Sequence, residues 1–217
     1  MISFSKFIFP RRFATQASFK SPLQIFKFTP DKNIGDFERA FNSGCWYIDA
    51  GTTHYNGSDI QKALTRLPPN VQRHNYFIVT SMKMMDFRDT YIRAFLGDQL
   101  KKLRLSHIDR VILECPEYCK MEYGNEMTED LKLMIQQSWS AMEKCYHEGK
   151  VRSLGVRNFD AQMLEHLLAK CKVKPSLVEV KPDEKVNESR LVRLCKSKGI
   201  ESIKVVDLKD WSAGHFC

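Results

Sequence analysis

Polar or charged side chains directly follow several short apolar runs of this sequence. They are Asp49, the run Thr80-Ser-Met-Lys83, Glu114, the pair Arg157-Asn158, and Glu179. Glu114 is the clearest case, because it ends the apolar run in DRVILECPE and precedes a cysteine and a proline. An unpaired charge is costly to bury, so this carboxylate must be paired or must have a chemical role. A glutamate held protonated in an apolar pocket could donate a hydrogen bond.

The elements that would position these residues are short strands alternating with longer helical segments. The apolar runs are Leu23–Phe28, Cys45–Asp49, Tyr76–Thr80, Val111–Leu113, Val151–Val156, Leu177–Val180 and Ile203–Val206. Each run has the length of a buried strand. Their alternation with segments of helical period predicts repeated βα units and a parallel sheet.

Six helical segments separate the predicted strands. The first ends at Gly44, the fourth covers about Glu129 to His147, the fifth begins after Asp160, and the sixth covers about Glu188 to Lys198. The α/β order leaves open whether the sheet is open or closed into a barrel. No GxGxxG motif follows the first strand, so nothing favours a dinucleotide-binding open sheet. In a barrel, the polar residues at the strand ends would lie where the chemistry takes place.

Composition sets outer limits on the function. The chain has 217 residues, of which 43% are hydrophobic and 28% charged, which suits a soluble globular protein. No apolar run approaches the roughly 20 residues of a membrane span. The net charge of +8 admits an acidic partner or an anionic cofactor. Nucleic acid is disfavoured, because the basic residues are scattered, and the seven cysteines show neither zinc nor disulfide spacing, so no metal site is predicted.

The first residues differ in composition from the rest of the chain. Five basic residues precede the first acidic one: Lys6, Arg11, Arg12, Lys20 and Lys27. That composition, with abundant Ser, Thr and Phe, is typical of a mitochondrial presequence. We therefore expect residues 1–22 to be a presequence, residues 23–217 to form the domain, and the protein to lie in the mitochondrial matrix. The alternative is a disordered leader without targeting information on a cytoplasmic protein.

Several ordered segments resemble the aldo-keto reductases. They are CWYIDAGTTHYNG, FIVTSMK, LKKLRLSHIDRVILECP, WSAMEKCYHEGKVRSLGVRNF, and PSLVEV followed by LVRLCKSKGI. The resemblance runs from about Leu23 to Ile200. It implies a (β/α)8 barrel of the TIM type and carbonyl reduction by NADPH.

The resemblance also assigns roles to the strand-end residues. Tyr55 occupies the place of the tyrosine that protonates the developing alkoxide. Lys83 occupies the place of the cation that eases ionisation of this phenol, and Asp49 would pair with Lys83. Asn158, Arg157 and Glu179 occupy the nicotinamide-binding positions. The alternative is structural: Asp49 would be a strand-end cap, Tyr55 a loop aromatic and Lys83 a solvated charge.

Departures from the family pattern are concentrated in this site. An insertion before Tyr55 makes His54 a rival for the tyrosine position, and another before Lys83 makes Met82 a rival for the lysine position. Arg157 replaces a serine, and Glu179 replaces a glutamine, which exchanges a carboxamide for an acceptor-only carboxylate.

Glu114 stands where most of the family has a substrate-binding histidine. The steroid 5β-reductases carry glutamate at this position and reduce a carbon–carbon double bond, so enone chemistry is one reading. The other reading is a salt bridge from Glu114 to Lys83 or Arg157 in a pocket that no longer supports catalysis.

The end of the chain departs most from the family. After Ile200 the sequence supplies one further strand, and the family's last βα units are missing. We therefore expect an incomplete barrel of about seven strands and six helices, with weak NADPH binding and open edges. Another copy or another protein would cover those edges.

Two functions follow from these features. The first is a divergent NAD(P)H-dependent oxidoreductase that reduces a small carbonyl or enone substrate. The second is a non-catalytic descendant that serves as a scaffold or subunit of a mitochondrial assembly.

Overall fold

A computed structural model of the chain describes residues 25–27, 33–51, 57–84, 89–116, 127–180 and 190–204. The predicted presequence lies outside these ranges. The strands are β1 (Ile25–Lys27), β2 (Tyr47–Asp49), β3 (Phe77–Lys83), β4 (Arg110–Glu114), β5 (Leu154–Arg157), β6 (Leu177–Val180) and β7 (Glu201–Lys204). The α-helices are α1 (Ile34–Asn42), α2 (Gly57–Thr65), α3 (Asp89–Leu103), α5 (Glu129–His147), α6 (Ala161–Lys170) and α7 (Arg190–Lys198), and a 3₁₀ turn, η2, covers Arg73–Asn75.

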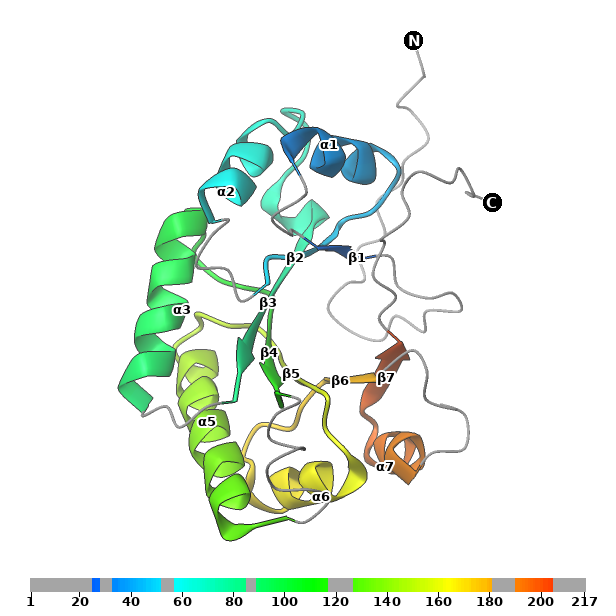
Figure 1. Cartoon of the computed structure of the whole chain (residues 1–217). Helices are drawn as coiled ribbons and strands as arrows, with labels where there is room; N and C mark the ends of the chain where they lie inside the picture. The colour runs from blue at the N-terminus through cyan, green and yellow to red at the C-terminus, as the bar shows by residue number, and fades with distance from the viewer. Residues whose placement is uncertain are drawn as a thin grey trace.

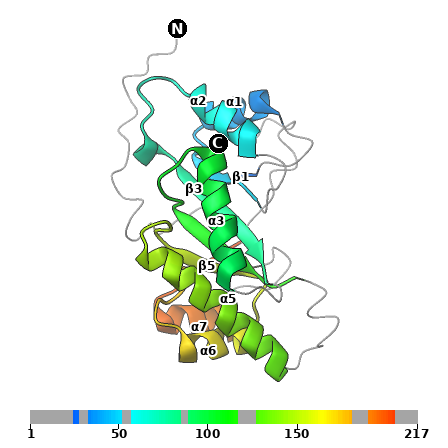
Figure 2. The same ribbon diagram turned by 90° about the vertical axis from the view of Figure 1, so that its left-hand side faces the viewer.

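The seven strands form one parallel sheet in the order of the sequence, from β1 to β7. The sheet is curled, and the helices lie along its convex side (Figure 1). Helices α3 and α5 pack against each other on this outer side (Figure 2). Within the described residues β1 and β7 are the two edges of the sheet, so the predicted incomplete (β/α)8 barrel is confirmed.

Capping residues fix where the helices begin and end. The Asp160 side chain accepts a hydrogen bond from the backbone N–H of Met163, so the predicted N-cap of α6 is confirmed. The Thr128 side chain plays the same part for α5. Gly44 follows α1 with a φ of 92°, a conformation that glycine adopts without steric cost. These signals explain why the helix boundaries could be read from the sequence.

Most of the apolar core lies between the sheet and the helices. Leu113, Val156 and Val178 point outward from the strands and meet helical residues such as Trp139 and Leu164. Parallel strands covered by helices on this face bury their apolar side chains almost completely.

The concave face of the sheet carries a much smaller apolar layer. It consists of Tyr47, Val79, Ile112 and Leu177, with Phe77 packed against them. A Cβ atom at Gly155 would lie 3.2 Å from the Leu177 carbonyl oxygen, so glycine permits close packing at this level. Toward the C-terminal ends of β4, β5 and β6 the inward residues are Glu114, Arg157 and Glu179.

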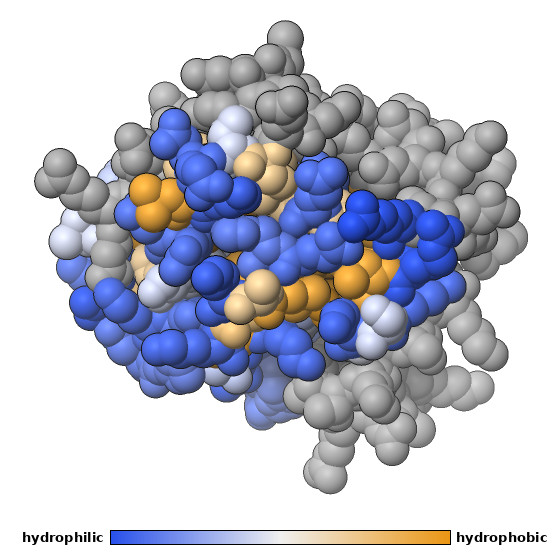
Figure 3. Space-filling view, turned by 90° about the horizontal axis from the view of Figure 1, so that it is seen from below, coloured by the Kyte–Doolittle hydropathy of each residue, from blue (hydrophilic) through white to orange (hydrophobic). Residues whose placement is uncertain are grey.

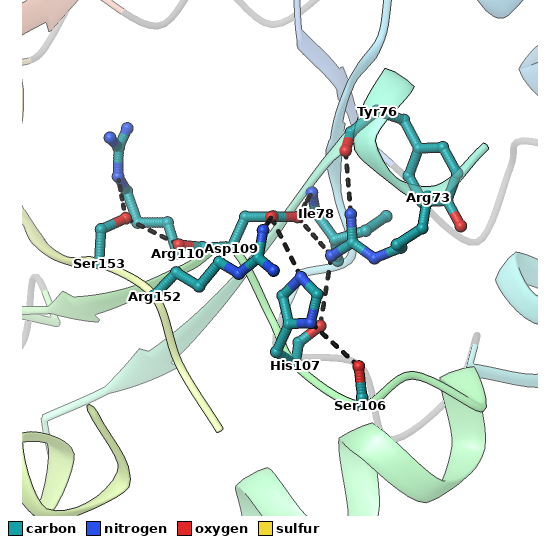
Figure 4. Close-up of polar contacts among 9 residues, drawn as sticks. All are labelled: Arg73, Tyr76, Ile78, Ser106, His107, Asp109, Arg110, Arg152 and Ser153. Carbon is teal, nitrogen blue, oxygen red and sulfur yellow. Dashed lines mark hydrogen bonds and ion pairs between the residues drawn. The ribbon is translucent and has the colours of Figure 1, made fainter. Parts of the chain in front are cut away.

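Asp109 ties together the N-terminal ends of β3, β4 and β5 (Figure 4). One of its carboxylate oxygens, Oδ2, accepts a hydrogen bond from the backbone N–H of Ile78 at 2.8 Å and pairs with Arg73 Nη2 at 2.5 Å. The Ser153 hydroxyl donates to the Asp109 carbonyl at 2.7 Å. Arg73 also donates to the carbonyls of Tyr76 and His107. At this end of such a sheet, buried polar groups serve stability rather than catalysis.

Glu143 fixes the entry into β6. Its carboxylate accepts hydrogen bonds from the backbone N–H groups of Lys172 and Val173, at 2.6 and 2.8 Å. Trp139 Nε1 donates to the Val173 carbonyl at 3.0 Å. Helix α5 thereby holds the turn that leads into the strand bearing Glu179.

The outer face seen from below is mostly hydrophilic, with a band of hydrophobic surface near its centre (Figure 3). The large apolar side chains exposed in the described ranges are Tyr91 and Leu133. None of the helices that the structure describes has both the length and the apolar character to cross a membrane.

Replacing Asp109 by asparagine should destabilise the fold by roughly 2–4 kcal/mol, because Arg73 loses its buried countercharge. Chemical denaturation of the purified chain measures this free energy of unfolding. The matched control is Asp98→Asn on α3, which breaks an exposed pair with Lys102 and should cost less than about 1 kcal/mol. Equal effects of the two substitutions would contradict the role given to Asp109.

Candidate functional site

The predicted strand-end residues form a row across the sheet. Lys83, Glu114 and Arg157 are successive register partners on β3, β4 and β5, and Arg157 is in turn the partner of Glu179 on β6. Register partners in a parallel sheet point to the same face. That face is the concave one, because neighbouring residues such as Met82, Leu113 and Val156 belong to the outer core.

Arg157 is the centre of this row. Its Nη2 lies 3.1 Å from Asp49 Oδ2, its Nη1 lies 3.5 Å from Glu114 Oε2, and its Nε donates to Glu179 Oε2. The Arg157 side chain is 15% exposed, while the Asp49 and Glu179 side chains are 3% and 2% exposed. One buried cation therefore contacts three carboxylates, an arrangement suited to the planar fork of arginine donors.

Burial and charge pull the pKa values of this cluster in opposite directions. Burial alone would lower the pKa of Arg157, but the carboxylates of Glu179 and Asp49 raise it above its ordinary value. Burial raises the pKa of Glu179 above its ordinary value, although Arg157 opposes the shift. Arg157 is therefore permanently charged, and Glu179 is the carboxyl group that resists ionisation.

Asp49 is fixed on both of its oxygens. Its Oδ1 accepts a hydrogen bond from the Gly51 N–H at 2.8 Å, while Oδ2 faces Arg157. The Thr80 hydroxyl donates to the Gly51 carbonyl at 2.7 Å, which ties this turn to β3. Asp49 is thus a strand-end cap, as the structural alternative expected, and also an ion-pair partner.

The expected pair between Asp49 and Lys83 is not present. Lys83 is exposed and forms no ion pair with another residue that the structure describes. Asp49 pairs with Arg157 instead, because the arginine lies deeper and presents several donors. The salt bridge predicted for Glu114 is formed with Arg157, the second of the two partners considered.

Lys83 and its rival Met82 point to opposite faces of β3. Met82 is buried in the outer core among residues facing the helices, whereas Lys83 shares the concave face with Glu114. Tyr55 and its rival His54 lie outside the described residues. Asn158 follows β5 in a left-handed conformation with a φ of 59°, which asparagine tolerates better than most residues.

A second polar layer at the concave face was not predicted. Arg110 Nη1 donates to the Tyr47 hydroxyl at 3.2 Å, and its guanidinium lies 5.2 Å from the centre of the Phe77 ring. Tyr47 and Phe77 stack with ring centroids 4.9 Å apart. Burial raises the pKa of Tyr47, so its phenol is neutral. The available signal was strand alternation, which places Arg110 on the same face as Glu114.

No metal centre accompanies these groups. Within the described ranges, no set of three or more His, Cys, Asp or Glu side chains is arranged to hold a metal ion. The carboxylates of Asp49, Glu114 and Glu179 are directed at the guanidinium of Arg157. The cation that these carboxylates bind is therefore the Arg157 side chain. Few of their oxygen atoms remain available to bind a ligand.

Replacing Arg157 by methionine should destabilise the protein by about 3–5 kcal/mol at neutral pH, because Asp49 would lose its buried countercharge. The loss should shrink as the pH falls, since protonation removes the unpaired carboxylate charge. Urea denaturation at several pH values measures both effects. Arg93→Met is the control, because it breaks a more exposed pair with Glu148 and should cost less than about 1 kcal/mol. An Arg157→Met variant as stable as this control would rule out the cluster as a structural anchor.

Comparison with known proteins identifies relatives over most of the chain. The model of the aldo/keto reductase family matches residues 22–209. Prostaglandin-E(2) 9-reductase of Oryctolagus cuniculus is 30% identical over 173 residues, which are 74% of this chain and 53% of that protein. Aldo-keto reductase family 1 member C15 of Rattus norvegicus is 32% identical over the same shares. The chain thus spans about half the length of the curated relatives it matches.

Solved structures agree with this result at the level of the fold. The aldose reductase of Schistosoma japonicum superposes with a TM-score of 0.65 at 20% identity, over 83% of this chain and 64% of that one. An aldo/keto reductase of Brucella melitensis gives a TM-score of 0.66 at 23% identity, over 82% and 65% of the two chains. The incomplete barrel agrees with the family match, which covers most of the chain, and the chain belongs to the aldo/keto reductase family.

Proposed function

We propose that this chain is a non-catalytic member of the family, in which a salt-bridge cluster has replaced the carbonyl-reduction site. The observation that carries the proposal is the contact of the Arg157 guanidinium with the carboxyl groups of Asp49, Glu114 and Glu179. Relatives are named as reductases, and one, from Mus musculus, as estradiol 17 beta-dehydrogenase 5. The proposal concerns how this member departs from them.

Carbonyl reduction needs a proton donor beside the substrate, and the described residues do not provide the oriented cation that a tyrosine donor requires. A tyrosine acid has an ordinary pKa near 10 and needs a neighbouring cation to ease its ionisation. By resemblance Lys83 is that cation and Asp49 orients it, but Asp49 is held by Arg157 and by the Gly51 N–H. Lys83 is exposed, so a solvated lysine would have to act without its orienting partner.

The residues present do not fit a nicotinamide ring. The positions that resemble its carboxamide contacts are Arg157, Asn158 and Glu179, and two of them are bonded to each other. Binding a carboxamide there would require Arg157 to release buried carboxylates, which is costly. Only Asn158 offers the expected kind of group.

Glu114 is also unsuited to polarise a substrate carbonyl. Its Oε2 lies 3.5 Å from Arg157 Nη1, and an ionised carboxylate only accepts hydrogen bonds. A carbonyl oxygen needs a donor at this position. The pairing therefore supports a structural role for Glu114 over the enone reading.

The proposed role is that of a protein subunit or scaffold. The edges β1 and β7 of the described sheet carry backbone groups that a further strand could pair with. The partner would be a second copy or another protein, in the mitochondrial matrix if the basic leader acts as a presequence, and otherwise in the cytoplasm. Light scattering on the purified chain distinguishes a homo-oligomer from a monomer that needs another partner.

A second candidate is an NAD(P)H-dependent reductase with an altered site. It is favoured by the convergence of Asp49, Lys83 and Glu114 at the C-terminal ends of adjacent strands, where barrel enzymes hold their catalytic groups. If a ligand displaced the Arg157 side chain, Asp49, Lys83 and Glu114 could act on a bound substrate. The substrate would then be a small carbonyl or enone compound.

Nucleotide binding separates the two candidates. We expect the purified full chain to show no saturable binding of NADPH and no NADPH-dependent reduction of nitrobenzaldehyde, because Arg157 and Glu179 are committed to each other. Isothermal titration and the decrease of NADPH absorbance measure these two properties. The double variant Arg157→Ser, Glu179→Gln removes the ion pair and restores the side chains typical of the family, so any gain of binding should appear there first.

Saturable NADPH binding by the unmodified chain, with turnover lost in Tyr55→Phe, would establish the reductase and contradict the non-catalytic proposal. Arg93→Met serves as the control for unspecific effects of removing a positive charge. It should leave nucleotide binding as it is in the unmodified chain, because Arg93 lies on α3 and pairs with Glu148.

A further inference from the structure

The cluster around Arg157 contains more negative than positive charge. Among the side chains that the structure describes at this end of the sheet, the carboxyl groups of Asp49, Glu114 and Glu179 face two cations, Arg157 and, at the exposed margin, Lys83. One negative charge is therefore left without a partner if every group is ionised. Interiors of proteins do not tolerate such an excess without a compensating ion or proton.

Glu179 is the carboxyl group of the cluster at which a negative charge would be least well stabilised. Its side chain is 2% exposed, and its Oε1 is fully buried with no hydrogen-bond partner. Its other oxygen, Oε2, accepts from Arg157 Nε. An ionised carboxylate accepts hydrogen bonds on both oxygens, so an orphaned oxygen is an unfavourable place for negative charge.

The neighbouring described groups do not supply the missing countercharge. Those facing Glu179 across the concave side, strand by strand, are Tyr47 and Asp49 on β2, Lys83 on β3, Arg110 and Glu114 on β4, Arg157 on β5, and Glu201 on β7. Arg110 is hydrogen-bonded to Tyr47 and Ser153, and Glu201 adds a further carboxyl group near it. Arg110 opposes the rise in the pKa of Glu179, but Arg110 and Glu201 together add one positive and one negative charge, so the surplus among the described side chains stays the same.

We propose that Glu179 holds a proton in the folded protein, so that the strand-end cluster takes up one proton on folding and makes stability depend on pH. The proton neutralises the surplus charge and leaves Arg157 paired with Asp49 and Glu114. Oε2 of the neutral carboxyl group still accepts from Arg157. The proton site is a property of the fold and holds whether or not the protein reduces carbonyls.

The electrostatic environment supports this assignment. Burial raises the pKa of Glu179, Arg157 opposes the shift, and Asp49 adds to it, with a net rise. An unfolded glutamate ionises near its ordinary pKa of about 4.3, while the folded one ionises at higher pH. Between these values the folded state binds more protons. Glu179 therefore contributes its full stability below about pH 4, and that contribution is lost as the pH rises through the folded pKa.

The decisive comparison is Glu179→Gln, because glutamine imitates the protonated carboxyl group at every pH. Urea denaturation of the full chain and of this variant should give similar midpoints near about pH 4.5. As the pH rises to about 8, the midpoint of the unmodified chain should shift progressively below that of the variant. Glu165→Gln is the matched control, because Glu165 lies on α6 outside the cluster and pairs with Arg190 at the surface, and it should keep the pH dependence of the unmodified chain.

Infrared spectroscopy reads the proton directly and does not depend on the variant folding well. The unmodified chain should show the carbonyl stretching band of a protonated carboxyl group at pH values above the ordinary glutamate pKa of about 4.3, where the other glutamates are ionising. The band should be absent from Glu179→Gln and present in Glu165→Gln. Absence of the band in the unmodified chain, or the same pH dependence of unfolding with and without Glu179, would overturn the proposal.

Discussion

A single buried guanidinium shared by three carboxylates is the constraint on which the concave face of this protein depends. Arg157 connects β2, β4, β5 and β6 through its contacts with Asp49, Glu114 and Glu179. Charges are placed in such an interior only with their partners, so the positions of four strands are coupled through one side chain. At the opposite end of the strands, Asp109 performs the corresponding task with Arg73 and Ser153. On the concave face, the small apolar layer that includes Tyr47 accompanies these clusters, and Arg110 donates a hydrogen bond to the Tyr47 hydroxyl.

The two clusters have different consequences for function. The one around Asp109 is a backbone anchor at the end of the sheet where barrels are stabilised. The cluster around Arg157 lies at the C-terminal ends of the strands, where barrel enzymes hold their catalytic residues. In this protein the side chains at those positions contact one another. Membership of the aldo/keto reductase family and the proposed loss of its reaction are therefore compatible, because fold and ancestry do not fix activity.

The elements of the fold could largely be predicted from the sequence. Leu177–Val180 was predicted with the bounds that β6 has, and Asp160 was predicted as an N-cap. Strand β3 was predicted to end at Thr80 but continues to Lys83, because its pairing with β4 outlasts the apolar run. Val151 was predicted to begin the fifth strand but forms only an isolated bridge with Ile108, and the regular pairing of β5 with β4 starts at Leu154. Pairing between strands decides these ends, and it is not encoded in local periodicity.

The sequence predicted which residues gather at the candidate site, but not which of them pair with each other. Strand alternation brings Asp49, Glu114, Arg157 and Glu179 to one end of the sheet, as expected. Which cation binds Asp49 depends on side-chain length, depth and donor geometry across strands that are distant in sequence. These properties favour Arg157 over Lys83.

The most direct test of the non-catalytic account is a crystal structure of the full chain grown with an excess of NADPH. The account predicts that the Arg157 guanidinium stays within hydrogen-bonding distance of Asp49 and Glu179, with no nicotinamide at the strand ends. Electron density for a nicotinamide ring beside Asn158, with Arg157 turned away from Glu179, would contradict it.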